Sequence, residues 1–411
     1  MTKENSRRDY FLLLLIFLLA LFLRVIYLPQ IAKEPPISDE AGYDEAAMNL
    51  ISGQGYGMFG YKSYQPPLYP FFLAGIYRLF GHNYIMVKVI QMILGSFGCI
   101  LLYSIAKIVF NGRIGLVSAF IYALYDGFIF LNGHLLTENL FVLLILLFVL
   151  LLLRFSKTEN LFLLMFSGVL IGLAALTKTN VLVSVPFLCI WFWTRSKKWV
   201  LHSLVLILFI GMTILPWTIR NYLILHHFVP IATYTGESLF RFNYPNGMDV
   251  ELTRERARFK ELGLKEGEMN SYYCKRLIEY VRNNSKDYFC DFFAWKVDWN
   301  IKSFFFSDYI WFPCSKPGVS IPYIPLISWR VLSFFSFMGI LLSFRCWKRL
   351  SLFYFYLFPQ IILILTLFFA WTRFRLSLEP FFIISAAFSI YSVFNPEFIE
   401  SFHKREIVLE S

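Results

Sequence analysis

Four carboxylates lie within seven residues of the sequence, at Asp39, Glu40, Asp44 and Glu45. If Asp39 begins a short helix, then Asp39, Tyr43 and Ala46 share one face of it, since residues three and four positions apart are neighbours on a helix. A solvated helix start would explain these acids. It would not explain the glycine-rich turn Gly53–Tyr56 and the rigid pair Pro66–Pro67 that follow. We therefore expect Asp39 to serve as a general base beside the phenol of Tyr43.

Four basic residues occur where apolar stretches end, namely Lys178, Arg220, Arg373 and Arg375. An Arg guanidinium offers two parallel N–H donors to phosphate oxygens, and Lys supplies a point charge. Snorkelling to lipid phosphates or capping of a helix C-terminus would explain any single one of them. Four such groups on one face of a membrane favour an anionic ligand, and a lipid-linked phosphate is the natural candidate.

Thr137 and Glu138 precede a further apolar stretch. Thr137 could cap a helix that begins at Glu138, and an acid in the first turn would stabilise that helix without any further role. Alternatively, Glu138 lies at the same membrane boundary as the basic groups and takes part in one site with them. Both interpretations remain open from the residues alone.

The composition assigns these residues to a membrane protein. Of 411 residues, 58% are hydrophobic, 20% aromatic and only 16% charged. Soluble domains carry roughly a quarter charged residues, so a globular enzyme in aqueous solution is excluded. The net charge of +11 does not indicate a nucleic-acid partner, because the chain has no soluble basic domain and clustered Lys and Arg usually set membrane topology.

Apolar stretches long enough to cross a bilayer predict an all-α polytopic membrane protein with about ten transmembrane helices. The predicted spans are residues 10–28, 84–109, 114–132, 139–155, 160–177, 179–195, 199–217, 326–344, 352–370 and 380–394. Basic residues precede the first span and no small-residue cleavage site follows it, so we expect an uncleaved signal anchor. The short loops then assigned to the cytoplasmic side are rich in Lys and Arg, which places both termini in the cytoplasm.

Two polar segments are too long to be tight turns, residues 29–83 and 218–325, and both are predicted on the outer face. The predicted organisation has four parts. Residues 1–217 form a transmembrane catalytic module that includes a first outer loop of juxtamembrane helices, and residues 218–325 form an outer-face segment. Residues 326–395 form C-terminal transmembrane helices, and residues 396–411 form a cytoplasmic tail. Within the outer-face segment, the charged stretch Glu251–Arg282 and the aromatic-rich Tyr288–Phe306 are typical of an amphipathic helix lying along the bilayer.

Seven short motifs follow one another along the chain on the predicted outer face. They are Asp39-Glu40 with Tyr43 and Ala46, Gly53-x-Gly55-Tyr56, Pro66-Pro67-Leu68-Tyr69-Pro70, Thr137-Glu138-Asn139-Leu140-Phe141, Leu176-Thr177-Lys178, Pro216-Trp217-x-x-Arg220-Asn221 and Arg373-Phe374-Arg375-Leu376-x-Leu378-x-Pro380. In this order they resemble the polyprenyl-phosphate-dependent glycosyltransferases of the GT-C superfamily. The chain is similar to the branch with protein mannosyltransferases, aminoarabinose transferases acting on lipid A and rhizobial lipopolysaccharide core glycosyltransferases, over roughly residues 10–395.

The resemblance implies roles for several residues. The first acid of the first outer loop is the proposed catalytic base of these enzymes, which corresponds to Asp39, with Glu40 as its neighbour in the motif. The late basic motif, here Arg373 and Arg375, is associated with the donor phosphate, and Glu138 belongs to the same cavity.

Gln65 departs from the family pattern. Some members have a Lys immediately before the paired prolines and use it on the phosphate, whereas this chain has Gln65. Lys178, Arg220 or Arg373 would then have to supply the positive charge.

The sequence thus predicts a membrane glycosyltransferase, a hexosyl- or pentosyltransferase acting by inversion on the outer face of the plasma (inner) membrane. Its partners would be a polyprenyl-phosphate-linked sugar, a lipid, lipopolysaccharide, polymer or protein acceptor, and membrane lipids. Three alternatives stay open: a flippase or transporter of a lipid-linked sugar, a lipid-diphosphate-dependent polymerase or ligase, and a membrane scaffold. A transporter would place polar groups near the bilayer midplane, whereas the polar residues here gather at one face.

Neither a metal nor another cofactor is expected. A monophosphate leaving group can be held by guanidinium groups, and the adjacent His226 and His227 point in different directions. The six cysteines show no CxxC spacing, which disfavours a zinc site. A Cys274–Cys290 disulfide is possible if both residues face an oxidising compartment.

Overall fold

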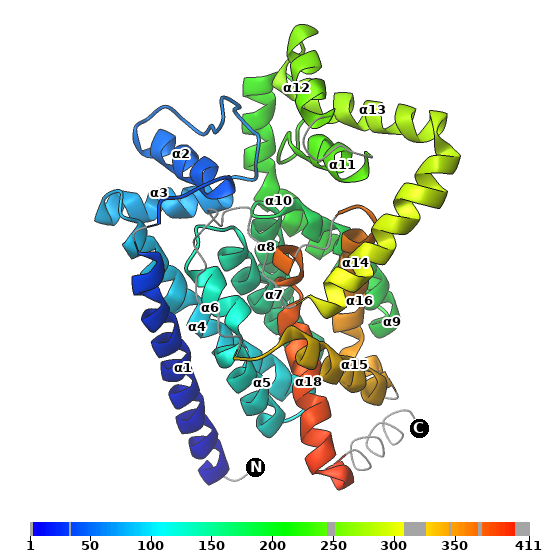
Figure 1. Cartoon of the computed structure of the whole chain (residues 1–411). Helices are drawn as coiled ribbons and strands as arrows, with labels where there is room; N and C mark the ends of the chain where they lie inside the picture. The colour runs from blue at the N-terminus through cyan, green and yellow to red at the C-terminus, as the bar shows by residue number, and fades with distance from the viewer. Residues whose placement is uncertain are drawn as a thin grey trace.

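The computed structural model describes residues 3–32, 34–244, 251–307, 326–344, 347–368 and 372–398. The regular secondary structure in this part of the chain is helical, apart from one isolated β-bridge between Met58 and Tyr61. Long helices form a bundle, and shorter helices cover one end of it (Figure 1). The predicted all-α fold class is confirmed.

Each of the ten predicted spans coincides with one or two helices. Five are long and apolar enough to cross a membrane: α1 (Lys3–Ile31), α4 (Tyr84–Val109), α7 (Glu138–Thr158), α10 (Trp199–Leu225) and α16 (Trp347–Thr366). A sixth span is broken by a 54° bend between α5 (Gly112–Leu124) and α6 (Asp126–Asn132). The rest are short, at α8 (Leu161–Ala175), η1 (Thr179–Ser184) with α9 (Val185–Arg195), α15 (Trp329–Ser343) and α18 (Glu379–Phe394). The count of ten spans therefore stays a prediction.

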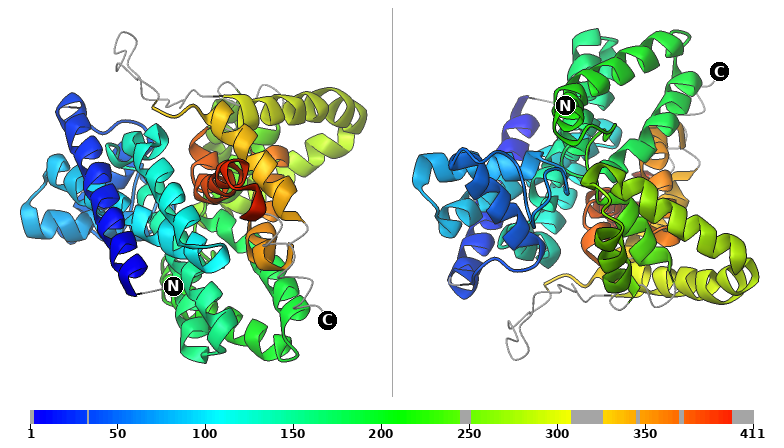
Figure 2. Two further views of the ribbon diagram at one scale, coloured as in Figure 1. Left: turned by 90° about the horizontal axis from the view of Figure 1, so that it is seen from below. Right: turned by 90° about the horizontal axis from the view of Figure 1, so that it is seen from above.

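The two ends of the bundle differ. The N-terminal end of α1 and the C-terminal end of α18 lie at the lower end in Figure 1. At the opposite end lie α2 (Asp39–Ile51) and α3 (Leu68–Phe80) of the first polar segment, together with α11 (Thr235–Asn243), α12 (Leu252–Glu261) and α13 (Met269–Asn283) of the second (Figures 1 and 2). The two predicted outer segments thus meet at one end of the molecule, and the start of α1 and the end of α18 lie at the other end.

The outer-face segment is folded as a cap of several short helices, so the expectation of one amphipathic helix is wrong. Its position along the bilayer stays a prediction. Gly263, with a φ of +65°, ends the helical stretch after α12, and α13 follows the short 3₁₀ turn η3 (Glu266–Glu268). The aromatic stretch continues as the π-helical η4 (Asp287–Phe293) and then α14 (Ala294–Phe306). The first three cap helices share a small core of their own, made by Phe240, Leu252, Phe259, Met269 and Tyr273.

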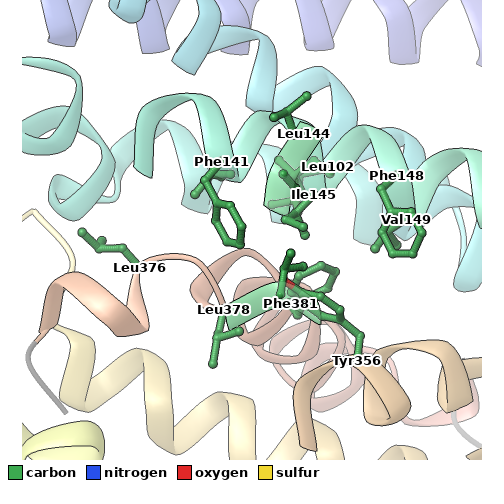
Figure 3. Close-up of a cluster of buried hydrophobic side chains, with 14 of the residues drawn as sticks. Leu102, Phe141, Leu144, Ile145, Phe148, Val149, Tyr356, Leu376, Leu378 and Phe381 are labelled. Carbon is green, nitrogen blue, oxygen red and sulfur yellow. The ribbon is translucent and has the colours of Figure 1, made fainter. Parts of the chain in front are cut away.

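Helix α7 passes through the main hydrophobic core. Phe141, Ile145 and Phe148 of this helix are almost fully buried and face the chain around Leu378 and Phe381 (Figure 3). Because α7 is packed along its length, its first residue is held in a fixed place at the capped end of the bundle.

Close packing of α15 on α18 gives a test of the fold. A Cβ on Gly339 would lie 1.9 Å from the carbonyl oxygen of Ser385, whereas a Cβ on Gly211 of α10 would meet no atom within 4 Å. We expect Gly339→Ala to destabilise the protein by about 1–3 kcal/mol, because backbone atoms must move apart. Gly211→Ala should leave stability unchanged or raise it, since Ala favours helix. Thermal unfolding of the purified variants in detergent measures both, and equal melting temperatures would contradict this packing.

Candidate active site

A cavity of about 990 Å³ opens at the capped end of the bundle. One wall comes from the first polar segment and the turns after α8 and α16, with Asp39, Tyr43, Gln65, Lys178 and Arg373. The opposite wall comes from the cap, with Glu237, Arg241, Arg256 and Lys260 among its residues. Segments far apart in the sequence therefore surround one polar space.

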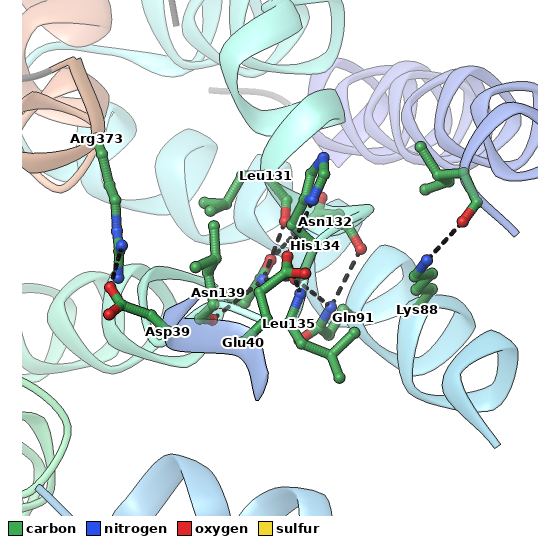
Figure 4. Close-up of polar contacts among 12 residues, drawn as sticks. Asp39, Glu40, Lys88, Gln91, Leu131, Asn132, His134, Leu135, Asn139 and Arg373 are labelled. Carbon is green, nitrogen blue, oxygen red and sulfur yellow. Dashed lines mark hydrogen bonds and ion pairs between the residues drawn. The ribbon is translucent and has the colours of Figure 1, made fainter. Parts of the chain in front are cut away.

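Four charged side chains form a connected network at this cavity. Arg373 Nε donates to Glu138 Oε1, and Lys178 Nζ lies 2.8 Å from the same oxygen. Arg373 also donates through a terminal nitrogen to Asp39 Oδ2, at 2.6 Å (Figure 4). Glu138 is fully buried beneath the cavity, whereas the Asp39 side chain is 39% exposed. The network balances two carboxylates with two cations, and Asp39 is its most exposed member.

Burial and charge act in opposite directions on these groups. Burial disfavours the charged form of Arg373, but the carboxylates of Glu138 and Asp39 outweigh it and hold its pKa well above the usual value. Burial lowers the pKa of Lys178, and Glu138 opposes that shift. Burial, with the nearby Asp39 charge, raises the pKa of Tyr43, so this phenol stays protonated and donates to Gln65 Oε1 at 3.1 Å.

Glu40 points away from the cavity and anchors α2. Its Oε1 accepts from the backbone N–H of Leu135 at 3.1 Å and lies 3.0 Å from Nδ1 of His134 (Figure 4). Gln91 and Asn139 each donate to the carbonyl oxygen of His134 at 2.9 Å. The turn before α7 is thereby fastened both to α4 and to the start of α2, which sets Asp39 opposite Glu138.

Thr137 and Glu138 do more than begin a helix. Thr137 occupies the N-cap position of α7, but its hydroxyl donates to Glu138 Oε2 at 3.1 Å and makes no capping hydrogen bond. The structure therefore agrees with the second interpretation, in which Glu138 belongs to the same charged network as Lys178 and Arg373. The expectation that the Thr137 side chain caps α7 is wrong.

Arg220 holds a loop and does not line this cavity. It donates to the carbonyl oxygens of Lys62 at 2.6 Å and Tyr56 at 3.0 Å, and to Ser63 Oγ at 2.8 Å. Its guanidinium lies 4.6 Å from the ring centre of Trp217. These contacts fix the loop that leads to Gln65, so Arg220 helps to position a wall of the cavity without lining it.

Arg375 is likewise turned away from the cavity. Its side chain is almost fully buried, pairs with Glu379 at 2.6 Å and donates to the carbonyl oxygens of Phe304 and Ser307 at 2.9 and 3.0 Å. The guanidinium lies 4.0 Å from the ring centre of Trp329. Arg375 therefore joins α14, α15 and α18, whereas Arg373, two residues earlier, reaches the cavity.

The cap contributes residues that the sequence analysis missed. Arg256 pairs with Glu237, which also accepts from the Tyr64 hydroxyl at 2.9 Å. Arg241 lines the cavity, and its buried Nε has no hydrogen-bond partner in the described structure. Glu237 and Arg241 are four residues apart, and this spacing could have indicated that both lie on one face of a helix. No known motif marks the pair.

The structure offers no candidate metal site among the residues that it describes, since they contain no cluster of three or more His, Cys, Asp or Glu side chains suited to a metal ion. Cys99, Cys189, Cys274 and Cys290 are free thiols, so the Cys274–Cys290 bridge that the sequence allowed is not formed. Cys314 and Cys346 lie outside the described residues.

Comparison with known proteins bears on the fold. Residues 64–219 match the family model described as dolichyl-phosphate-mannose-protein mannosyltransferase. No curated protein matches the chain. Among solved structures, the chain is similar to the archaeal oligosaccharyltransferase AglB from Archaeoglobus fulgidus in complex with an inhibitory peptide and a dolichol-phosphate, at 16% identity and a TM-score of 0.58 over 96% of this chain and 51% of that chain.

Two further structures are similar. The Archaeoglobus fulgidus oligosaccharyltransferase in complex with Zn and sulfate gives 14% identity and a TM-score of 0.59 over 97% of this chain and 51% of that chain. ArnT from Cupriavidus metallidurans bound to undecaprenyl phosphate gives 11% identity and a TM-score of 0.42 over 95% and 78%.

The helical bundle matches the membrane GT-C fold of the oligosaccharyltransferase structures. The resemblance to GT-C glycosyltransferases inferred from the seven motifs is thereby confirmed. The chain spans about half the length of the oligosaccharyltransferase structures that it matches.

The network predicts unequal effects of removing its two carboxylates. Glu138→Ala would leave Lys178 and Arg373 buried without their shared partner, which should cost about 3–5 kcal/mol of stability. Asp39→Asn removes a partly exposed partner and should cost about 0–1 kcal/mol. Thermal unfolding of both variants in the same detergent checks the order. Equal losses would show that Glu138 is not the centre of the network.

Proposed function

We propose that this protein is an integral membrane glycosyltransferase that moves a sugar from a polyprenyl-phosphate donor to a cell-envelope acceptor. The observation that carries the proposal is the placement of Asp39, partly exposed, in one cavity with Lys178 and Arg373. A carboxylate and cations within one site are the groups needed to take a proton and to stabilise a phosphate leaving group. The family match of residues 64–219 and the GT-C fold support the same reaction class.

In the proposed reaction, Asp39 accepts the proton of an acceptor hydroxyl. The oxygen of that hydroxyl forms a bond to the anomeric carbon while the bond from this carbon to the phosphate oxygen breaks, and the electron pair leaves with the polyprenyl phosphate. Attack and departure on opposite faces of the sugar invert the anomeric centre. Arg373 and Lys178 would stabilise the charge that develops on the phosphate.

Arg373 is suited to link the two halves of this reaction. Its Nε is bound to the buried Glu138, while a terminal nitrogen reaches the partly exposed Asp39. A donor phosphate can therefore compete for the terminal nitrogen without releasing the side chain from Glu138.

The cap would face the acceptor. Its wall of the cavity combines the ion pair of Glu237 and Arg256 with the aromatic rings of Phe242 and Phe259. This mixture of apolar area and a few oriented polar groups is usual in ligand sites. We place the cavity on the periplasmic or extracellular face and both termini in the cytoplasm, in agreement with the basic loops at the other end.

The proposed base predicts a specific loss of activity. Asp39→Asn should lower sugar transfer by about 10²–10⁴-fold, measured with purified protein, radiolabelled polyprenyl-phosphate sugars and envelope lipids. Glu45→Gln is a matched control, because it removes one negative charge from the same helix outside the cavity. A folded Asp39→Asn protein with native transfer rates would refute the assignment. Label that appears inside sealed vesicles without a new glycoside would favour the flippase.

A second prediction concerns metals. If Arg373 and Lys178 stabilise the leaving phosphate, then treatment with EDTA should leave the transfer rate within about twofold of the untreated enzyme, whereas Arg373→Gln should lower it by about 10²-fold or more. The same donor assay measures both. Inactivation by EDTA that added Mg²⁺ or Mn²⁺ reverses would contradict the metal-free mechanism.

A further inference from the structure

An apolar groove of about 960 Å³ lies at the end of the bundle opposite the catalytic cavity. It is formed by α1, α4 and the ends of α7 and α8, and its apolar lining includes Leu13, Leu14, Phe17 and Phe97. Leu14 and Phe97 are exposed on the molecular surface. The groove therefore runs along the side of the bundle, where lipid chains contact a membrane protein.

Basic side chains gather where this groove ends. Lys107, Arg154 and Lys157 line it there, and Lys107 and Lys157 also line an adjoining cavity of about 580 Å³. Arg195 and Arg349 complete the basic lining of that second cavity. Glu159 is the one acid among the residues that line the two spaces. Apolar walls thus lead directly into a strongly positive basin.

The basin lies far from the catalytic residues. Glu138 begins α7 at the catalytic end, and Lys157 lies in the last turn of the same helix. A helix of 21 residues is about 30 Å long, which is the thickness of the hydrocarbon core of a bilayer. The two sites therefore lie at opposite membrane boundaries.

Topology and helix capping account for only part of this arrangement. Lys157 Nζ lies 3.3 Å from the carbonyl oxygen of Ile108, as expected of a cation near helix C-termini. Lys107 donates to the Tyr103 hydroxyl at 3.1 Å and lies 5.2 Å from the ring centres of Tyr10 and Tyr103. Arg154 is exposed and forms no ion pair with any described residue. Neither membrane topology nor helix capping requires the basic side chains to lie at the end of an apolar groove.

We propose that this groove and basin bind an anionic phospholipid from the leaflet opposite the catalytic cavity. Its acyl chain would lie along Leu14 and Phe17, and its phosphate would contact Lys107, Arg154 and Lys157. Basic pockets between membrane helices bind anionic headgroups, and each basic group near the membrane surface contributes about fivefold in affinity. The site is independent of the proposed glycosyl transfer.

The test compares phosphatidylglycerol with phosphatidylcholine carrying the same acyl chains, by native mass spectrometry of the delipidated full-length protein in detergent. Phosphatidylglycerol should bind at least tenfold more tightly. Lys107→Gln combined with Lys157→Gln should weaken its binding by about 30-fold. Lys197→Gln combined with Lys198→Gln removes the same charge from a neighbouring exposed turn that lines neither space, and should change binding by less than about twofold.

Arg154→Gln keeps the test decisive if the double variant does not fold. This side chain is exposed, so the variant should fold normally and bind phosphatidylglycerol about fivefold more weakly than the native protein. Equal binding of the two lipids, or native affinity in Arg154→Gln and the Lys107/Lys157 variant, would overturn the proposal. Stronger binding of a polyprenyl phosphate than of phosphatidylglycerol at this site would also overturn it.

Discussion

The capped end of the molecule depends on the neutralisation of one buried carboxylate. Glu138 is fully buried at the start of α7, and an uncompensated charge in such a place costs several kcal/mol. Its two partners, Lys178 and Arg373, lie 40 and 235 residues away in the sequence. The turn after α8 and the short α17 (Thr372–Arg375) must therefore close on the start of α7. A requirement of folding thus assembles the cationic wall of the cavity.

The same interaction connects folding to the proposed chemistry through Arg373. One part of the guanidinium satisfies Glu138, and another reaches Asp39. Because the side chain is anchored by its buried partner, exchange of the exposed partner for a phosphate would cost little reorganisation. Glu40 fixes the other side of the contact, since its bonds to the turn before α7 hold the first residue of α2 in register. The position of Asp39 therefore follows from a neighbouring residue that does not enter the cavity.

Hydrophobic patterning was sufficient to predict the apolar helices of the bundle, and residue type was sufficient to collect the charged candidates outside the cap. Neither signal shows in which direction a charged side chain points. Arg373 and Arg375 both belong to α17, but the first points toward Glu138 and the second toward Glu379 and the end of α14. Arg220 is a third such group, and carbonyl oxygens of the first polar segment occupy it. Separating these roles requires the tertiary contacts, because the sequence signal for all three residues is the same.

The cap shows a different reason for failure. Its helices are short and charged, and Phe240, Leu252, Phe259, Met269 and Tyr273 of these helices pack on one another in a small core. A pattern typical of a membrane-surface helix therefore also describes a helix that folds onto a neighbour. The packing also sets the charge of that wall: Arg256 pairs with Glu237, whereas Arg241 and Lys260 are the cavity-lining cations of the cap that form no ion pair within the described structure. A ligand that carries negative charge toward the cap would meet these two residues before it disturbed any existing ion pair.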